Sequence, residues 1–107
     1  MYEPTFVDDF REHFRKLTKK DGISKQRLET KINEMLQEKP RNPIEYIADL
    51  KGKWKARVGD YRMPYAYCED CKSKHYKQYN QCFSCDSIKE NSIVFFDIFH
   101  RSKDYEE

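Results

Sequence analysis

The chain has 107 residues, which is enough for one domain but too few for two independent cores. Charged and hydrophobic residues each make up 37% of it, and its 8 tyrosines, 7 phenylalanines and single tryptophan can bury enough area to exclude full disorder. A net charge of +2 is no argument for a polyanionic partner by itself. The longest apolar run, Ile93–Phe96, falls far short of the ~20 residues that cross a bilayer, so we expect a cytoplasmic protein with no membrane partner.

The first part of the chain predicts three helices. Apolar residues at helical spacing, with charged residues between them, indicate a helix from Pro4 or Thr5 to about residue 19. A second helix begins at Ser24, a suitable N-cap, and ends before Pro40. A third begins at residues 42–43, where Asn caps and Pro occupies the first turn, and ends at residue 52 or 58.

The character of the sequence changes near Gly59. Tyrosines and cysteines follow, and β-branched and aromatic residues over Ser92–Phe99 predict a strand. We therefore predict an α+β fold in one compact unit. Three N-terminal helices (residues 1–59) pack on a small zinc-stabilised β module held by four cysteines (residues 60–102), and residues 103–107 form a frayed tail.

The four cysteines form two Cys-x-x-Cys pairs, Cys68/Cys71 and Cys82/Cys85, with ten residues between the pairs. Each pair can point two thiolates at one cation, and two pairs complete the tetrahedral sulfur shell that Zn²⁺ favours. The sequence therefore predicts one structural Zn²⁺ as cofactor. The pairs resemble those of a zinc ribbon or knuckle, with a shorter linker than usual.

Other interpretations of the cysteines stay open. The same ligands can hold iron, His75 can replace one cysteine, and the thiols can be free or form two disulfides. A catalytic metal would need an open coordination position and a nearby acid or base, and the His-x-Glu signature is missing. Glycine-rich phosphate loops and nucleophile elbows are missing as well. We therefore predict that the chain is not an enzyme and has no small-molecule substrate.

Basic residues are interleaved with Trp54 and Tyr61 in one segment and recur after the first cysteine pair. Cations can neutralise phosphates while aromatic faces stack on bases. The predicted nucleic-acid-binding residues are Lys51, Lys53, Lys55, Arg57, Arg62, Lys72, Lys74 and Lys77. The plainer interpretation is that Trp54 is buried in the core and that the lysines are solvated.

Residues 39–54 carry a resemblance to a known family. The segment reads Lys-Pro-Arg-Asn-Pro-Ile-Glu-Tyr-Ile-Ala-Asp-Leu-Lys-Gly-Lys-Trp. It is similar to the closing helices of DnaD-type replication-initiation and helicase-loading proteins of phages and plasmids. The resemblance implies a replication role with DNA or a replicative helicase as partner, carried by Tyr46, Ile47, Lys53 and Trp54.

Two functions follow from these patterns. The first is a non-catalytic zinc-binding accessory protein that binds nucleic acid, DNA rather than RNA, in the replication or transcription of a phage or mobile element. The alternative is an adaptor or inhibitor that docks on a host polymerase or helicase. Its docking surface would be a helix face or an exposed edge strand at Ile93–Phe99.

Overall fold

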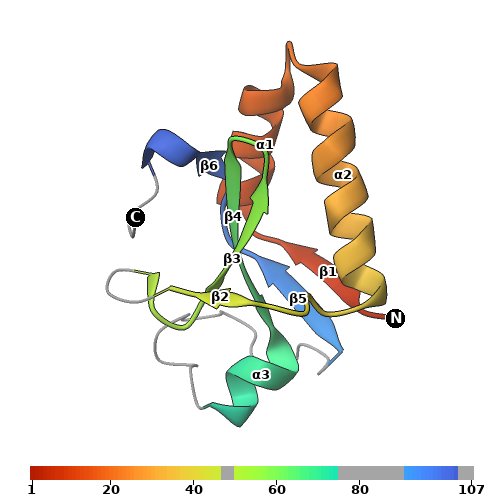
Figure 1. Ribbon diagram of the computed structural model, residues 1–107, viewed down its shortest axis with the longest axis vertical. Helices are drawn as coiled ribbons and strands as arrows, with labels where there is room; N and C mark the ends of the chain where they lie inside the picture. Colours follow the sequence, from red (N-terminus) through yellow and green to blue (C-terminus); the bar gives the residue numbers. More distant parts are fainter. Residues whose placement is uncertain (47–49, 75–90, 104–107) are drawn as a thin grey trace.

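The computed structural model describes residues 1–46, 50–74 and 91–103. Its elements run β1 (Glu3–Phe6), α1 (Asp8–Thr18), α2 (Gly22–Gln37), β2 (Ile44–Glu45), β3 (Trp54–Val58), β4 (Tyr61–Tyr67), α3 (Cys68–Ser73), β5 (Ser92–Phe95) and β6 (Phe99–His100) (Figure 1). A short 3-10 turn follows at Arg101–Lys103. Within these ranges no helix is both long and apolar enough to cross a bilayer.

The described strands form a single six-stranded sheet. Its order is β1-β5-β4-β3-β2, and β6 pairs with β4 beside this path. The edge strand β1 runs parallel to β5, whereas the other neighbours are antiparallel. The two last strands share one partner, because β5 pairs with the end of β4 and β6 with its beginning. The α+β class is therefore confirmed, with both parts of the chain in one sheet.

Helices α1 and α2 supply one side of the apolar core. Phe10 of α1 stacks between Phe6 and Phe14, and its ring centroid lies 5.6 Å from that of Phe95 in β5. The core cluster consists of Phe10, Leu28, Ile32, Met35, Trp54, Ala56, Met63, Tyr65, Ala66, Tyr67, Ile93, Phe95 and Ile98. The many aromatic residues of the sequence therefore fill the space between the helices and the sheet.

The first two predicted helices are confirmed, with one change. Residues Glu3–Phe6 form the strand β1 instead of a helical turn, since their backbone pairs with β5. In α2 the side chain of Asp21 accepts a hydrogen bond from the Ser24 amide at 3.0 Å, so Asp21 caps the helix rather than Ser24.

The third predicted helix is wrong in the described residues. Ile44 and Glu45 form β2, and the segment that begins at Trp54 forms β3. Trp54, Ala56 and Val58 alternate with polar residues. A strand forms here instead of a helix because this alternation lets the hairpin with β4 place all three against the core. Residues 47–49 lie outside the described residues.

The strand predicted at Ser92–Phe99 divides into β5 and β6. Asp97 interrupts it, because its carboxylate accepts a hydrogen bond from the Ile98 amide at 2.8 Å and contacts His13 of α1. β5 lies between β1 and β4, and all four of its residues are buried. The prediction of an exposed edge strand that docks on a partner is therefore wrong for β5.

Candidate functional site

The β3–β4 hairpin has one apolar face and one basic face. Strand side chains alternate between faces, and Ala56 and Met63 belong to the core that α1 and α2 cover. The intervening residues Lys55, Arg57 and Arg62 therefore share the opposite face. Arg57 and Arg62 are paired directly across the two strands. Like charges in such a position destabilise a sheet, so this pair is unfavourable for the fold alone.

Two lysines near this face, Lys53 and Lys55, lie over aromatic rings. The ammonium nitrogen of Lys53 is 4.7 Å from the ring centroid of Phe96, and that of Lys55 is 5.1 Å from the ring centroid of Tyr46. Such contacts hold a cation in place by attraction to the electron-rich ring face. We call the group Lys53, Lys55, Arg57 and Arg62 the basic sheet face.

The four residues of the basic sheet face differ in how far their side chains are exposed. Arg57 is exposed and Lys53 is half-buried, whereas Lys55 and Arg62 are only 6% and 7% exposed. The Arg62 guanidinium donates hydrogen bonds to the carbonyl oxygens of Gly59 and Tyr61, each at 3.0 Å. These bonds fix its position at the hairpin turn.

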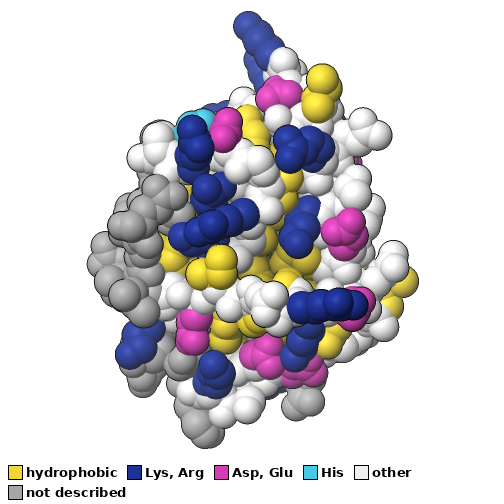
Figure 2. Space-filling model, viewed as in Figure 1, with side chains coloured by type: hydrophobic (Ala, Val, Ile, Leu, Met, Phe, Trp, Pro, Cys, Tyr) yellow, Lys and Arg dark blue, Asp and Glu magenta, His cyan; other side chains and the backbone are white. Residues whose placement is uncertain are grey.

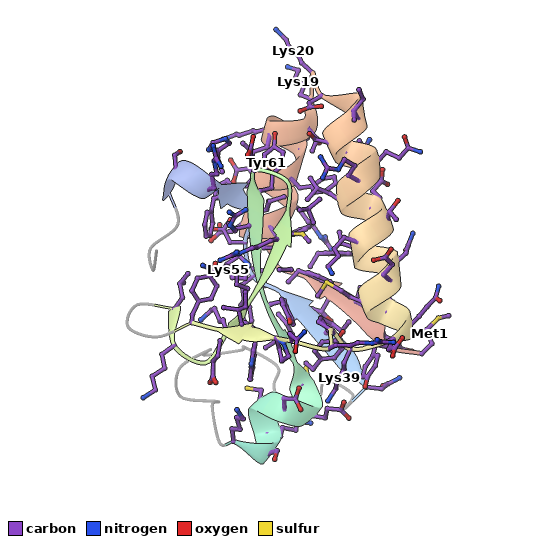
Figure 3. All side chains as sticks on the ribbon, viewed as in Figure 1. Met1, Lys19, Lys20, Lys39, Lys55 and Tyr61 are labelled. Atoms are coloured by element: carbon purple, nitrogen blue, oxygen red, sulfur yellow. The ribbon has the colours of Figure 1, made fainter. Side chains whose placement is uncertain are left out.

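The figures place this face in the molecule. Figure 2 shows Lys and Arg side chains gathered over the β3–β4 hairpin, in the middle of the face turned to the viewer. In the same view Lys55 lies beside the lower part of the hairpin and Tyr61 at its upper end (Figure 3). Lys19 and Lys20 project from the turn between α1 and α2, well away from Lys55 (Figure 3).

The end of the hairpin adds two contacts that the sequence did not predict. The Tyr61 and His100 rings meet edge to face, with centroids 6.2 Å apart. Arg101 donates its backbone amide to the Asp60 carbonyl at 2.6 Å, and its Nε lies 3.5 Å from the Asp60 carboxylate. The pairing of β6 with β4 brings these residues together. Such contacts depend on strand register and therefore cannot be predicted from the local sequence.

The structure brings together only part of the predicted nucleic-acid-binding set. Lys51 is exposed in the turn before β3, next to the basic sheet face in sequence. Lys72 and Lys74 belong to α3 and the residue after it, where Lys74 pairs with Glu45 at 3.6 Å and lies over the Trp54 ring. Lys77 and His75 lie outside the described residues. The burial predicted for Trp54 is confirmed, because it is 6% exposed.

The predicted zinc module is corrected by the structure. Cys68 and Cys71 are buried thiols of the short helix α3, while Cys82 and Cys85 lie outside the described residues. The described part of the chain offers no group of three or more His, Cys, Asp or Glu side chains that could hold a metal ion. A sheet with its own apolar core stands where the zinc ribbon was expected, so the Zn²⁺ cofactor and the zinc-stabilised architecture are wrong.

A polar cluster attaches α3 to the rest of the fold. Lys39, just after α2, pairs with the carboxylates of Glu69 and Asp70. The Tyr2 hydroxyl donates a hydrogen bond to Glu69 at 2.8 Å. The hydrogen bonds from Lys39 and Tyr2 hold the pKa of Glu69 below its usual value, whereas the same carboxylate raises the pKa of Tyr2.

Burial raises the pKa of the Tyr65 phenol to about 12.

The basic sheet face is suited to phosphate chemistry. Guanidinium and ammonium groups neutralise phosphates, and when they are partly desolvated they stabilise negative charge more strongly than in water. Of the two rings beside these cations, Tyr46 is only 1% exposed, so the half-buried ring of Phe96 is the one that offers a surface for stacking.

Comparisons with known proteins give the fold a context. Models of known protein families and curated protein sequences give no match to this chain. Among solved structures, the chain is similar to one described as the YoeB-YefM complex from Staphylococcus aureus, at 12% identity and a TM-score of 0.58 over 94% of this chain and 98% of that one. A second, the heterotetrameric YoeB-YefM toxin-antitoxin complex from the same organism, matches at 13% identity and a TM-score of 0.56 over 91% and 93% of the two chains.

These likenesses correct the resemblance drawn from residues 39–54. At this identity they show the fold alone, which the chain shares with a chain of these complexes. They overturn the resemblance to DnaD-type replication proteins, whose helical segment is strand and turn where the structure describes it. The predicted roles in replication or transcription of a phage, and as a polymerase or helicase adaptor, are set aside with it.

Proposed function

We propose that this chain is the globular component of a toxin–antitoxin pair and that it binds single-stranded RNA through the basic sheet face. The observation that carries the proposal is the fold likeness, which extends over 98% of a chain from a YoeB-YefM complex. Both neighbours are protein complexes, so a protein partner is part of the proposal. The apolar core between the helices and the sheet suits the globular component of such a pair, because a chain with its own core can fold as a unit.

The choice of ligand depends on where the charge lies. Helix α1 carries the acidic residues Asp8 and Asp9 in its first turn and basic residues in its last, so it is not a uniformly basic helix suited to a DNA groove. The cations instead lie on a sheet beside the half-buried ring of Phe96, and cations beside an accessible aromatic ring are the arrangement with which proteins bind single strands. This proposal replaces the sequence-based preference for DNA over RNA.

A binding assay with matched charge variants tests the proposal. We expect Lys53→Gln/Arg57→Gln to weaken the binding of a fluorescent single-stranded RNA and to reduce the slope of log K against log salt by about 0.7 for each phosphate that is no longer neutralised. The control Lys19→Gln/Lys20→Gln removes the same charge from the turn between α1 and α2 and should leave both quantities unchanged. Equal weakening in the two variants would mean that only net charge matters and would overturn the assignment of the face.

A second candidate function is cleavage of the bound RNA. The observation that favours it is the burial of Lys55 and Arg62, since desolvated cations stabilise the negative charge that develops on the phosphate oxygens more strongly than exposed ones. In such a reaction the ribose 2′-oxygen would attack the adjacent phosphorus, the 5′-oxygen would leave, and the 2′-hydroxyl proton would pass to it. That the chain is not an enzyme stays a prediction, and gel analysis of the RNA after the binding assay tests it.

A further inference from the structure

A cleft lies between α2 and the end of the β3–β4 hairpin. It has a volume of about 480 Å³, and three cations line it: Arg27 and Lys31 from α2 and Arg57 from β3. Figure 2 shows Lys and Arg side chains on both sides of the strip between the hairpin and α2, with hydrophobic side chains visible within it. One carboxylate, Glu34, also lines the cleft.

The three cations of the cleft are not used by the fold. Among the described residues, no side chain forms a hydrogen bond or ion pair with Arg27, Lys31 or Arg57. Three like charges around one hollow raise the positive potential there, and a bound anion would relieve it. Arg57 also belongs to the basic sheet face, so the two regions are continuous.

Gly59 leaves room for the guanidinium of Arg27. The backbone at Gly59 is left-handed, with φ of 57°, and a Cβ atom there would lie 3.1 Å from a terminal nitrogen of Arg27. The absence of a side chain thus lets the guanidinium lie against the hairpin turn. Arg27 also lines a second hollow of about 300 Å³, together with the Tyr61 and His100 rings. One guanidinium therefore stands between a cationic cleft and an aromatic pocket.

We infer that the cleft around Arg27 is a second subsite, which takes a phosphate of the bound RNA beyond the basic sheet face while an adjoining base enters the Tyr61–His100 pocket. The inference rests on the proposed function, because the strand it extends is the one bound by the basic sheet face. A pocket of this volume is at the small end of those that hold ligands, which suits a single base. The carboxylates of Asp21 and Asp60, which also line the pocket, can accept hydrogen bonds from amino groups of a base.

Oligonucleotides of two lengths test the second subsite. A charge-assisted hydrogen bond is worth about tenfold in affinity, so Arg27→Gln and Lys31→Gln should each weaken the binding of an RNA of about twelve nucleotides by about tenfold. Binding of an RNA of about four nucleotides, which the basic sheet face can hold alone, should not change. The matched control is Lys25→Gln, which removes an exposed charge from the same helix outside the cleft.

The outcomes separate this inference from the proposed function. If Arg27→Gln behaves like Lys25→Gln while Lys53→Gln/Arg57→Gln still weakens binding, the second subsite is overturned and the proposed function stands. If the unmodified protein binds neither RNA, both fail. Saturable binding of uridine monophosphate that Arg27→Gln abolishes, without any length effect on RNA, would assign the cleft to a free nucleotide and overturn the strand extension.

Discussion

The Tyr67 hydroxyl offers the sharpest test of the packing between the sheet and α2. This hydroxyl donates a hydrogen bond to the Met35 carbonyl at 2.7 Å, in a side chain that is 2% exposed. Met35 lies in the last turn of α2, where carbonyl groups have no partner within the helix. Nearby, the Tyr2 amide donates to the Leu36 carbonyl at 2.7 Å, so residues outside α2 complete the end of this helix.

Replacement of Tyr67 by Phe keeps the ring and removes only the donor. The Met35 carbonyl would then be buried without its bond, at a cost of about 2 kcal/mol. For a domain of about this size, each kcal/mol lowers Tm by about 4–8 °C, so we expect a fall of about 8–16 °C. Thermal unfolding followed by circular dichroism measures it, with Tyr61→Phe at the half-buried hairpin turn as control. A Tm within about 2 °C of the unmodified protein would refute the reasoning.

Three further predictions concern titration and the hairpin turn. Lys39 and Tyr2 lower the pKa of Glu69 in the folded protein, so the stability that Glu69 contributes is complete above its unfolded pKa of about 4.3 and is lost as pH falls through the folded pKa. Glu69→Gln should therefore reduce the loss of unfolding free energy at acid pH, measured by urea unfolding. An unchanged loss would contradict the interaction of Glu69 with Lys39 and Tyr2. Burial raises the pKa of Tyr65 to about 12, so the free energy of unfolding should fall as pH rises from about 10, where the unfolded phenol titrates. Tyr65→Phe should reduce that fall. The same pH dependence of stability in both proteins would count against the burial of this phenol. Gly59→Ala should cost about 1–2 kcal/mol, because alanine is strained at a φ of 57°, and a neutral effect on the denaturant midpoint would rule out the left-handed turn.

The spacing of apolar residues within one segment was enough to predict the two long helices. The apolar spacing of α1 and α2 was sufficient for both helices, since each covers the core with one face. The third predicted helix failed because Asn42-Pro43 resembles a helix start, while the alternation from Trp54 to Val58 is rewarded only when β4 pairs with it. Competition of this kind is decided by tertiary pairing and cannot be read from one segment.

The candidate site shows the same division. The basic segment around Lys55 and Arg57 was recognised from composition, but its paired arrangement with Arg62 depends on the register of the hairpin. Nothing near Arg27 in the sequence marks it as special, because the turn at Gly59 that it contacts lies far along the chain. The spacing of Cys68 and Cys71 suggested a metal site, yet in the fold this pair lies in a short helix and is buried.

The most direct test of the account is to map where single-stranded RNA binds. Titration of an RNA of about twelve nucleotides into the isotopically labelled protein, followed by amide chemical shifts, reports the binding surface residue by residue. We predict that the largest saturable changes fall on β3, on β4 near Arg62 and on the start of α2 near Arg27. Changes confined to the outer face of α1, or no changes at low salt, would contradict the assignment of the basic sheet face as the RNA-binding surface.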